Sequence, residues 1–167
     1  LFRLAGFYGR AKIYQESQRL LDKVAGWYKV NKGPDSEDYY LAAQNSVLLL
    51  CKLKNYSSAD SMMDVLLNRK KQLYGEGSLE YENAIHRAGI VFMQAENYNK
   101  AEDYFKKSVA LSRNAKRPSL LFSRLVLLDS LYEHQNITLQ RPPVLAEIID
   151  LHEKHKLLTD SAYGAKL

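Results

Sequence analysis

Among the residues that could bind a metal or act as nucleophiles, the sequence has four histidines and a single cysteine. His152 and His155 lie three residues apart, so a helix would present both on one face. This is not the H-E-x-x-H spacing of zinc proteases, and no second His or Cys pair follows nearby to complete a structural zinc site. Cys51 ends the apolar run 47–51, which predicts a buried thiol rather than a nucleophile. We therefore expect solvated helix histidines and no metal.

A phosphate-binding loop is the other chemistry that short motifs could supply. Gly75-Glu76-Gly77 has two glycines, but no third glycine follows and no strand is predicted before it. This segment is typical of a break between helices. No Ser/His/Asp or Cys/His arrangement around a strained turn is indicated either. The sequence thus predicts no catalytic residues, no cofactor and no small-molecule substrate.

Composition is that of a folded domain. The chain has 167 residues, of which 46% are hydrophobic, and no apolar run approaches the roughly 18 residues of a membrane span. The net charge is +5, but the basic groups 69–71 and 106–107 alternate along the chain with acidic residues. Solvated helix faces are the favoured interpretation, and a nucleic-acid surface is disfavoured.

The sequence opens on Leu1 within an apolar, helix-like segment. We therefore expect a fragment of a longer protein. Any leader sequence would lie outside a fragment, so the compartment is unassigned, with a cytoplasmic location favoured.

An internal repeat organises the chain. Tyr14, Tyr56 and Tyr98 each open a similar segment, at equal intervals of 42 residues. Further positions follow the same interval: Gly33 and Gly75; Ser36 and Ser78; Tyr39 and Tyr81; Ala42 and Ala84; Leu21, Met63 and Phe105; Val24, Leu66 and Ser108; Tyr8, Leu50 and Phe92. Several columns in one register indicate repeated structural units rather than chance.

Each unit has the periodicity of two helices. Ile85, Ala88, Gly89 and Phe92 fall on one helical face, and the segment 101–109 has the same pattern. The sequence predicts helices over residues 1–12, 14–31, 37–53, 56–73, 79–95, 98–113, 119–134 and 143–155.

The repeat columns resemble the tetratricopeptide repeat (TPR) family. The third unit carries the pattern best, in Ala88, Gly89, Phe92, Tyr98, Ala101, Phe105 and Ser108. The family's usual period is about 34 residues, so the interval here is similar to the long-period variety of kinesin light chains and many bacterial scaffold proteins. The resemblance implies an all-α fold, a right-handed superhelical stack of antiparallel helix hairpins.

The same resemblance suggests how the chain divides. Three hairpins are expected at about 1–34, 36–75 and 78–113. Residues 118–156 fit less well, because Gln140 stands where the tyrosine is expected, and they predict an atypical fourth or capping hairpin. Residues 157–167 are expected to fray.

The family fold implies a function as well as a shape. TPR stacks line a concave groove with the first helix of each hairpin, and such grooves hold protein segments. The groove positions away from the packing stripes are polar to basic: Gln44, Asn45, Lys52, Asn83, His86, Arg87 and Gln94. They suit an extended peptide with acidic residues, since amides can bond a peptide backbone and Arg can pair with carboxylates.

Within the family, a chaperone-binding role is disfavoured. The carboxylate clamp of those domains would need Lys and Asn where this sequence has Gln44, Leu48, His86 and Ile90. The leading hypothesis is a non-enzymatic protein–protein interaction scaffold. The alternatives are a basic helical-repeat RNA-binding module and a non-catalytic ancillary domain of a larger enzyme or signalling protein.

Overall fold

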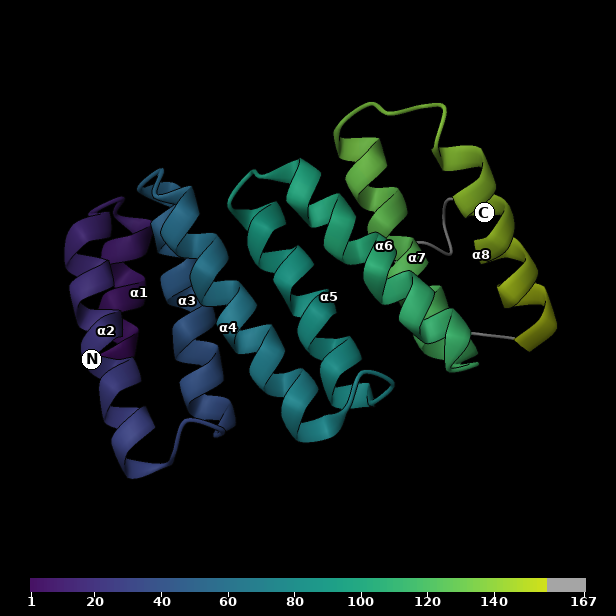
Figure 1. The fold of residues 1–167 in the computed structure, drawn as a ribbon. Coiled ribbons are helices and arrows are strands. Elements are labelled where there is room, and N and C mark those ends of the chain that lie inside the picture. The colour runs from purple at the N-terminus through teal and green to yellow at the C-terminus, as the bar shows by residue number, and fades with distance from the viewer. Residues whose placement is uncertain (156–167) are drawn as a thin grey trace. The chain divides into compact units, whose positions relative to one another are not determined.

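A computed structural model describes residues 1–155 of the chain, and the segment 157–167 that was expected to fray lies outside them. The described part contains eight α-helices and no strand, which confirms the all-α class (Figure 1). Each predicted helix is present, with ends within two residues of those expected. The helices are α1 (Phe2–Arg10), α2 (Tyr14–Asn31), α3 (Glu37–Lys52), α4 (Tyr56–Tyr74), α5 (Leu79–Gln94), α6 (Tyr98–Asn114), α7 (Pro118–His134) and α8 (Arg141–His155).

Two compact units make up the chain, Leu1–Ala101 and Glu102–Leu167. In the first unit each helix packs on its neighbour in sequence, so α2 contacts both α1 and α3, and α4 contacts both α3 and α5. The first helices of successive hairpins also meet, because α3 packs against α5. This is the contact pattern of stacked helix hairpins.

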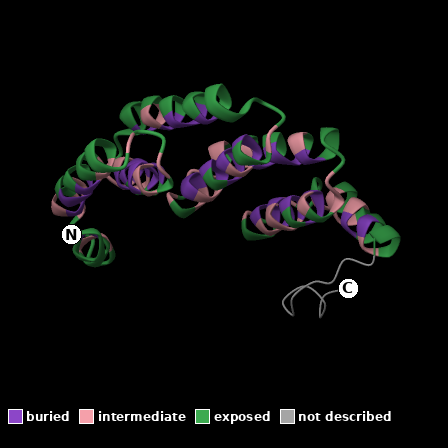
Figure 2. Cartoon of the chain, turned by 90° about the horizontal axis from the view of Figure 1, so that it is seen from below, coloured by how far each residue is buried: buried purple, intermediate pink, exposed green. Residues whose placement is uncertain are grey.

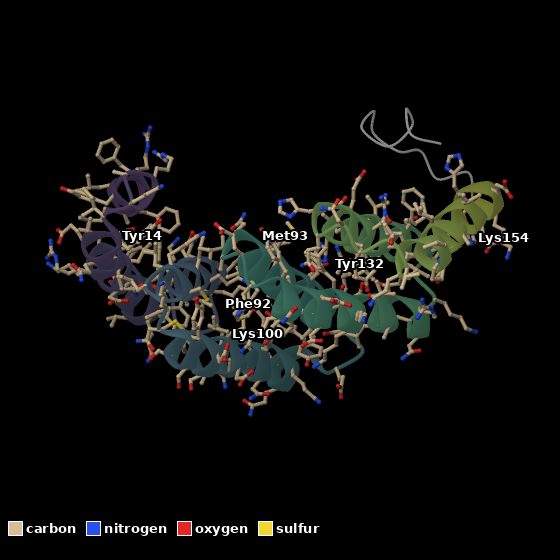
Figure 3. All side chains as sticks on the ribbon, turned by 90° about the horizontal axis from the view of Figure 1, so that it is seen from above. Tyr14, Phe92, Met93, Lys100, Tyr132 and Lys154 are labelled. Atoms are coloured by element: carbon tan, nitrogen blue, oxygen red, sulfur yellow. The ribbon has the colours of Figure 1, made fainter. Side chains whose placement is uncertain are left out.

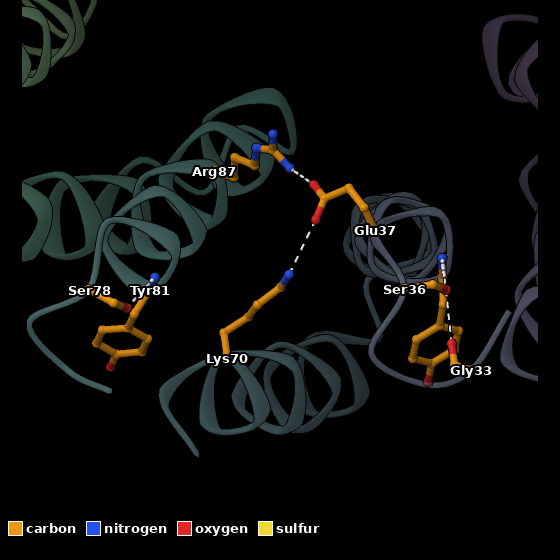
Figure 4. Close-up of polar contacts among 8 residues, drawn as sticks. Gly33, Ser36, Glu37, Lys70, Ser78, Tyr81 and Arg87 are labelled. Carbon is orange, nitrogen blue, oxygen red and sulfur yellow. Dashed lines mark hydrogen bonds and ion pairs between the residues drawn. The ribbon is translucent and has the colours of Figure 1, made fainter. Parts of the chain in front are cut away.

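The turns between hairpins are fixed by a repeated Gly-x-x-Ser motif. Gly33 and Gly75 have φ of 90° and 85°, a left-handed conformation in which glycine is favoured. Ser36 and Ser78 then cap α3 and α5, accepting hydrogen bonds from the amides of Tyr39 (3.3 Å) and Tyr81 (3.1 Å) (Figure 4). Each serine also donates its hydroxyl to the glycine carbonyl before it, at 2.8 and 2.7 Å. A serine therefore caps the first helix of the second and of the third hairpin.

The turns inside hairpins use a left-handed residue that is not glycine. Lys12, Lys54 and Glu96 have φ of 60°, 60° and 64° and recur at the interval of the tyrosines that follow them. Each of these residues lies two positions after the end of one helix and two positions before the start of the next. The recurrence shows that the backbone repeats along with the side-chain columns.

The core of the first unit forms where hairpins press together. Ala5, Leu20, Leu21 and Leu49 from three successive helices make one buried cluster. Ser17, which stands where the repeat pattern favours alanine, is also buried and donates its hydroxyl to the Ala5 carbonyl at 2.7 Å. The small residues at 5 and 17 allow the close approach, and the hydrogen bond offsets the cost of burying the hydroxyl.

Further along the same unit, large residues from two of the repeat columns fill the space between helices. Met63 and Phe92 are fully buried, and Lys100 lies with its Nζ 5.4 Å from the centre of the Phe92 ring while pairing with Asp60 of α4 (Figure 3). Each helix consequently has a buried side and an exposed side (Figure 2).

The second unit joins α7 to α8 through an ion pair whose acidic partner is buried. Asp129 is fully buried and accepts two hydrogen bonds from the Arg141 guanidinium, at 2.8 and 3.1 Å. Arg141 is the first residue of α8, so the pair fixes where this helix starts against α7. Tyr132 donates its hydroxyl to Glu102 at 3.0 Å, and burial, together with that carboxylate, raises the pKa of Tyr132 to about 12.

Replacing Phe105 tests whether the large residues of the repeat columns stabilise the fold by packing, because its ring is fully buried. We expect Phe105→Ala to lower the free energy of unfolding by about 3–5 kcal/mol, through lost transfer energy and the cavity it leaves. Chemical denaturation followed by circular dichroism measures the change. The matched control is Leu139→Ala, at a side chain that is 90% exposed in the same unit and should change stability by less than about 0.5 kcal/mol. Equal effects of the two substitutions would contradict the packing account.

Candidate functional site

A groove opens between α1 and α3 in the first unit, with α2 as its floor. It encloses a cavity of about 280 Å³. We call it the α1–α3 groove. Its lining residues are Phe2, Ala5, Gly6, Gly9 and Arg10 of α1, Tyr14, Ser17 and Leu21 of α2, and Asn45, Leu48, Leu49 and Lys52 of α3.

Two glycines keep this groove open. A Cβ placed on Gly6 would meet only the Arg10 guanidinium, at 3.7 Å, so the space beyond it is unfilled. At Gly9 a Cβ would meet Ser17 Oγ at 3.4 Å and Leu49 at 3.9 Å, so the helices come closer there. Glycine inside a helix is destabilising by roughly 0.5–1 kcal/mol relative to alanine. Gly6 therefore leaves open space on the α1 wall of the groove, and Gly9 allows the close approach of α2 and α3.

The rim of the groove is basic. Arg10 and Lys52 are the last residues of α1 and α3, where cations interact favourably with the helix dipole. Lys52 pairs with the exposed Glu96 at 2.8 Å, and the hydrogen bond from Lys52 lowers the pKa of that carboxyl. Arg10 has no ion pair within the described residues. At least one cationic group on the rim is thus available to an outside carboxylate.

The structure brings two of the predicted site residues to this groove, Asn45 and Lys52. Asn45 is exposed and donates one amide hydrogen to the Leu41 carbonyl at 2.8 Å. Gln94 of α5 is also exposed and lies one repeat interval after Lys52, as the last residue of its helix. These three side chains are accessible, and each belongs to the first helix of a hairpin: Asn45 lies in the middle of α3, and Lys52 and Gln94 end α3 and α5.

The other predicted positions are in different surroundings. Gln44 and His86 are buried, with 5% and 7% of their surface exposed, so a peptide on the surface would touch little of either side chain. The Gln44 Nε2 atom is buried without a hydrogen-bond partner. Asn83 is half-buried on α5.

Arg87 is exposed but already engaged within the molecule. It forms an ion pair with Glu37 of α3, and Lys70 of α4 reaches the other oxygen of the same carboxylate at 3.2 Å (Figure 4). Burial would raise the pKa of Glu37, but the hydrogen bonds from Arg87 and Lys70 outweigh it and hold that pKa below its ordinary value. One carboxylate therefore ties three helices together.

A larger cavity of about 520 Å³ lies between α2, α3 and α4, near the basic group 69–71. The cations of this basic group have acidic partners: Arg69 pairs with Asp35 through two hydrogen bonds of 2.6 and 2.8 Å, and Lys70 pairs with Glu37. Lys71 pairs with Glu76 at 2.7 Å. The three positive charges of this group are thus largely balanced in place.

Sites for chemistry are scarce in the part of the chain that the structure describes. It holds no group of three or more His, Cys, Asp or Glu side chains that could bind a metal ion. Cys51 is buried, and its burial raises the pKa of the thiol, which keeps it protonated at neutral pH. None of the described helices combines the length and apolar character needed to cross a membrane.

Comparison with known proteins finds similarity in structure only. No protein-family model and no curated protein sequence matches the chain. A putative kinesin light chain from Podosopora anserina, with nearly identical TPR-like repeats, superposes on 95% of this chain and 75% of its own, with a TM-score of 0.63 and 12% identity. BtubC (BKLC) from P. vanneervenii superposes on 95% of this chain with a TM-score of 0.60 and 14% identity.

The chain has the fold of the TPR-like repeat proteins. At these identities the likeness shows the fold alone. The chain spans 64% of the length of BtubC. In a TPR-like stack the first helices of the hairpins are neighbours, and this is the relation that α3 and α5 show here.

The sequence predicts Asn45 and Lys52 as site residues, and both line the groove, but it does not predict the glycines of the α1 wall. Gly6 and Gly9 carried a usable signal, because glycine inside a predicted helix weakens it unless space or a close approach is needed. The partnership of Arg87 with Glu37 had no local signal, since the two residues are 50 positions apart.

The Glu37 ion pairs predict a pH-dependent contribution to stability. A carboxyl whose pKa is depressed by folding stabilises the fold above its unfolded value, here 4.5, and loses that contribution as pH falls through the folded pKa. We expect Glu37→Gln to lower the melting temperature at pH 7, and the difference from wild type to shrink as pH falls below 4.5. Thermal melts from pH 7 to pH 3 measure this.

The control for this prediction is Glu153→Gln, at an exposed residue that has no ion pair among the described residues. It should leave the melting temperature close to wild type at every pH. A difference in melting temperature between Glu37→Gln and wild type that does not change with pH would contradict the stabilising role of the ionised Glu37 carboxylate.

Proposed function

We propose that this chain is a non-catalytic interaction module that holds an extended segment of a partner protein along the α1–α3 groove. The observation that carries the proposal is the α1–α3 groove itself, which has apolar lining residues, glycines in its α1 wall, and the guanidinium of Arg10 beside it. A groove of this kind accepts an apolar side chain, and the cation beside it favours a neighbouring carboxylate.

The groove offers complementary groups for each part of such a segment. Leu48 and the open strip at Gly6 contact the apolar side chain, while Arg10 and Lys52 face its acidic neighbours. The pair between Lys52 and Glu96 is an obstacle of modest size, because surface ion pairs contribute only about 0–1 kcal/mol. The Asn45 amide supplies hydrogen bonds to the peptide backbone.

The segment continues from α3 toward α5 in this proposal. Asn83, Arg87 and Gln94 would contact it there, and the buried Gln44 and His86 support the surface from behind. Because Arg87 already pairs with Glu37, the preference for acidic residues arises mainly at Arg10 and Lys52.

We also propose the long-period, kinesin-light-chain-like organisation for this chain. Its support is that α2, α4 and α6 begin at Tyr14, Tyr56 and Tyr98, with the left-handed turn residues repeating in the same register. Three regular hairpins are then followed by an atypical fourth, which the Arg141–Asp129 pair fixes in place. The module would act as one part of a larger scaffold.

The pairing of basic residues disfavours the RNA-binding alternative. Phosphate contacts need cations that are free to replace the counterions condensed on the nucleic acid. In the basic group 69–71, Arg69, Lys70 and Lys71 each have an acidic partner instead.

Two substitutions at one glycine test the groove. Gly6→Leu should fill the cavity, whereas Gly6→Ala should leave it open and stabilise α1 by roughly 0.5–1 kcal/mol. Peptides selected from a random phage-displayed library on the wild-type chain should combine a bulky apolar residue with acidic ones. They should bind the alanine variant about as well as wild type and the leucine variant at least about tenfold more weakly.

The charge requirement is tested with the same peptides. Arg10→Glu should reduce their affinity, and raising the salt concentration should weaken binding to the wild type. Equal binding to wild type and Gly6→Leu would show that the α1–α3 groove is not the site. Tight binding of single-stranded RNA that is lost on replacing the paired lysines and arginines would favour the alternative.

A further inference from the structure

Lys52, on the rim of the α1–α3 groove, is held by a carboxylate from the next hairpin. Its Nζ lies 2.8 Å from Oε1 of Glu96, a residue of the turn between α5 and α6 that is 44 positions further along the chain. Building on the function proposed above, we propose that Glu96 is an internal competitor of the partner. A carboxylate of the bound acidic segment replaces Glu96 on Lys52.

The internal repeat shows that Glu96 differs in charge from the other residues of its column. The two preceding turns inside hairpins have Lys12 and Lys54 at the same position, and all three residues have a left-handed backbone, with φ of 60°, 60° and 64°. This conformation favours glycine and asparagine and gives glutamate no advantage over lysine. The third turn is thus distinguished by the sign of its charge, which is opposite to that of the other two.

The cations near Glu96 include one that lies outside the groove. Arg10 and Lys52 both line the α1–α3 groove, whereas Lys12 does not. The hydrogen bond from Lys52 lowers the pKa of the Glu96 carboxyl, and the positive charges of Lys52 and Lys12 lower it further. The first three hairpins therefore bring their turn charges close together, and a carboxylate that takes the place of Glu96 would be attracted by Lys12 as well as by Lys52.

The contact between Lys52 and Glu96 is of the kind that a partner can displace. It consists of a single hydrogen bond, and 71% of the Glu96 side chain is exposed. The pair between Arg69 and Asp35 has two hydrogen bonds instead, and the Asp35 side chain is 39% exposed. Because an exposed ion pair contributes little to stability, a partner could replace Glu96 without disturbing the fold.

Replacing Glu96 tests the proposal, with the library-selected acidic peptides as the probe. Glu96→Gln keeps the size of the side chain but removes the competing charge. Fluorescence anisotropy should therefore show roughly two- to fivefold tighter binding, the range that corresponds to an exposed ion pair. In a Lys52→Gln background the same change should give little gain, because the shared cation is gone. Lys12→Gln should weaken binding, although Lys12 lies outside the groove.

Glu80→Gln is the matched control, since it removes the same charge from the opposite end of α5. Glu80 is exposed in the first turn of that helix, whereas Glu96 follows its last turn. The 16 residues of α5 span about 24 Å, which exceeds the screening length of about 8 Å at physiological salt. Glu80→Gln should therefore leave the affinity unchanged, and both variants should melt close to the wild-type temperature.

The groove and the competitor can fail separately. Selection of no peptide, or equal binding to wild type and Gly6→Leu, would contradict the groove and the competitor together. Peptides that require the open groove but bind Glu96→Gln no more tightly than wild type would overturn the competitor alone. So would an equal gain in Glu80→Gln or in the Lys52→Gln background. A lower melting temperature of Glu96→Gln with unchanged affinity would show that Glu96 only fastens the third hairpin to the second.

Discussion

The close packing of each hairpin against the next is the constraint on which this structure depends. A single hairpin cannot bury both sides of its helices, so α3 must use one face for α2 and others for α4 and α5. Small residues at the points of closest approach make this possible, as Ala5 and Ser17 do with their 2.7 Å hydrogen bond. Because every unit meets the same requirement, the same residue types recur in the same register.

The side chains that remain accessible after the helices have packed determine where a partner could bind. On α3 the positions left accessible include Asn45 and Lys52, and on α1 the glycines remove the side chains that would otherwise close the space. The charges follow the same rule, since carboxylates used to connect helices, such as Glu37, also neutralise nearby cations. Arg10 and Arg3, on the first helix, have no such carboxylate beside them. The start of the first unit therefore carries accessible positive charge.

The helices could be predicted well because their signals are local: apolar periodicity, a Gly-x-x-Ser turn and a cap within a few residues. The candidate site could be predicted only in part. Asn45 and Lys52 follow from helical geometry, but the burial of Gln44 and His86 depends on how neighbouring hairpins fit together. The Glu37–Arg87 pair joins residues 50 positions apart, and no local pattern in the sequence encodes it.

The most direct test of the central claim, that the α1–α3 groove holds a protein segment, is hydrogen–deuterium exchange with and without a library-selected acidic peptide. The account predicts slower exchange in α1 and in the second half of α3, where the groove residues lie, and unchanged exchange in α7 and α8. Protection confined to the segment 65–73 beside the larger cavity, with none in α1 or α3, would contradict it.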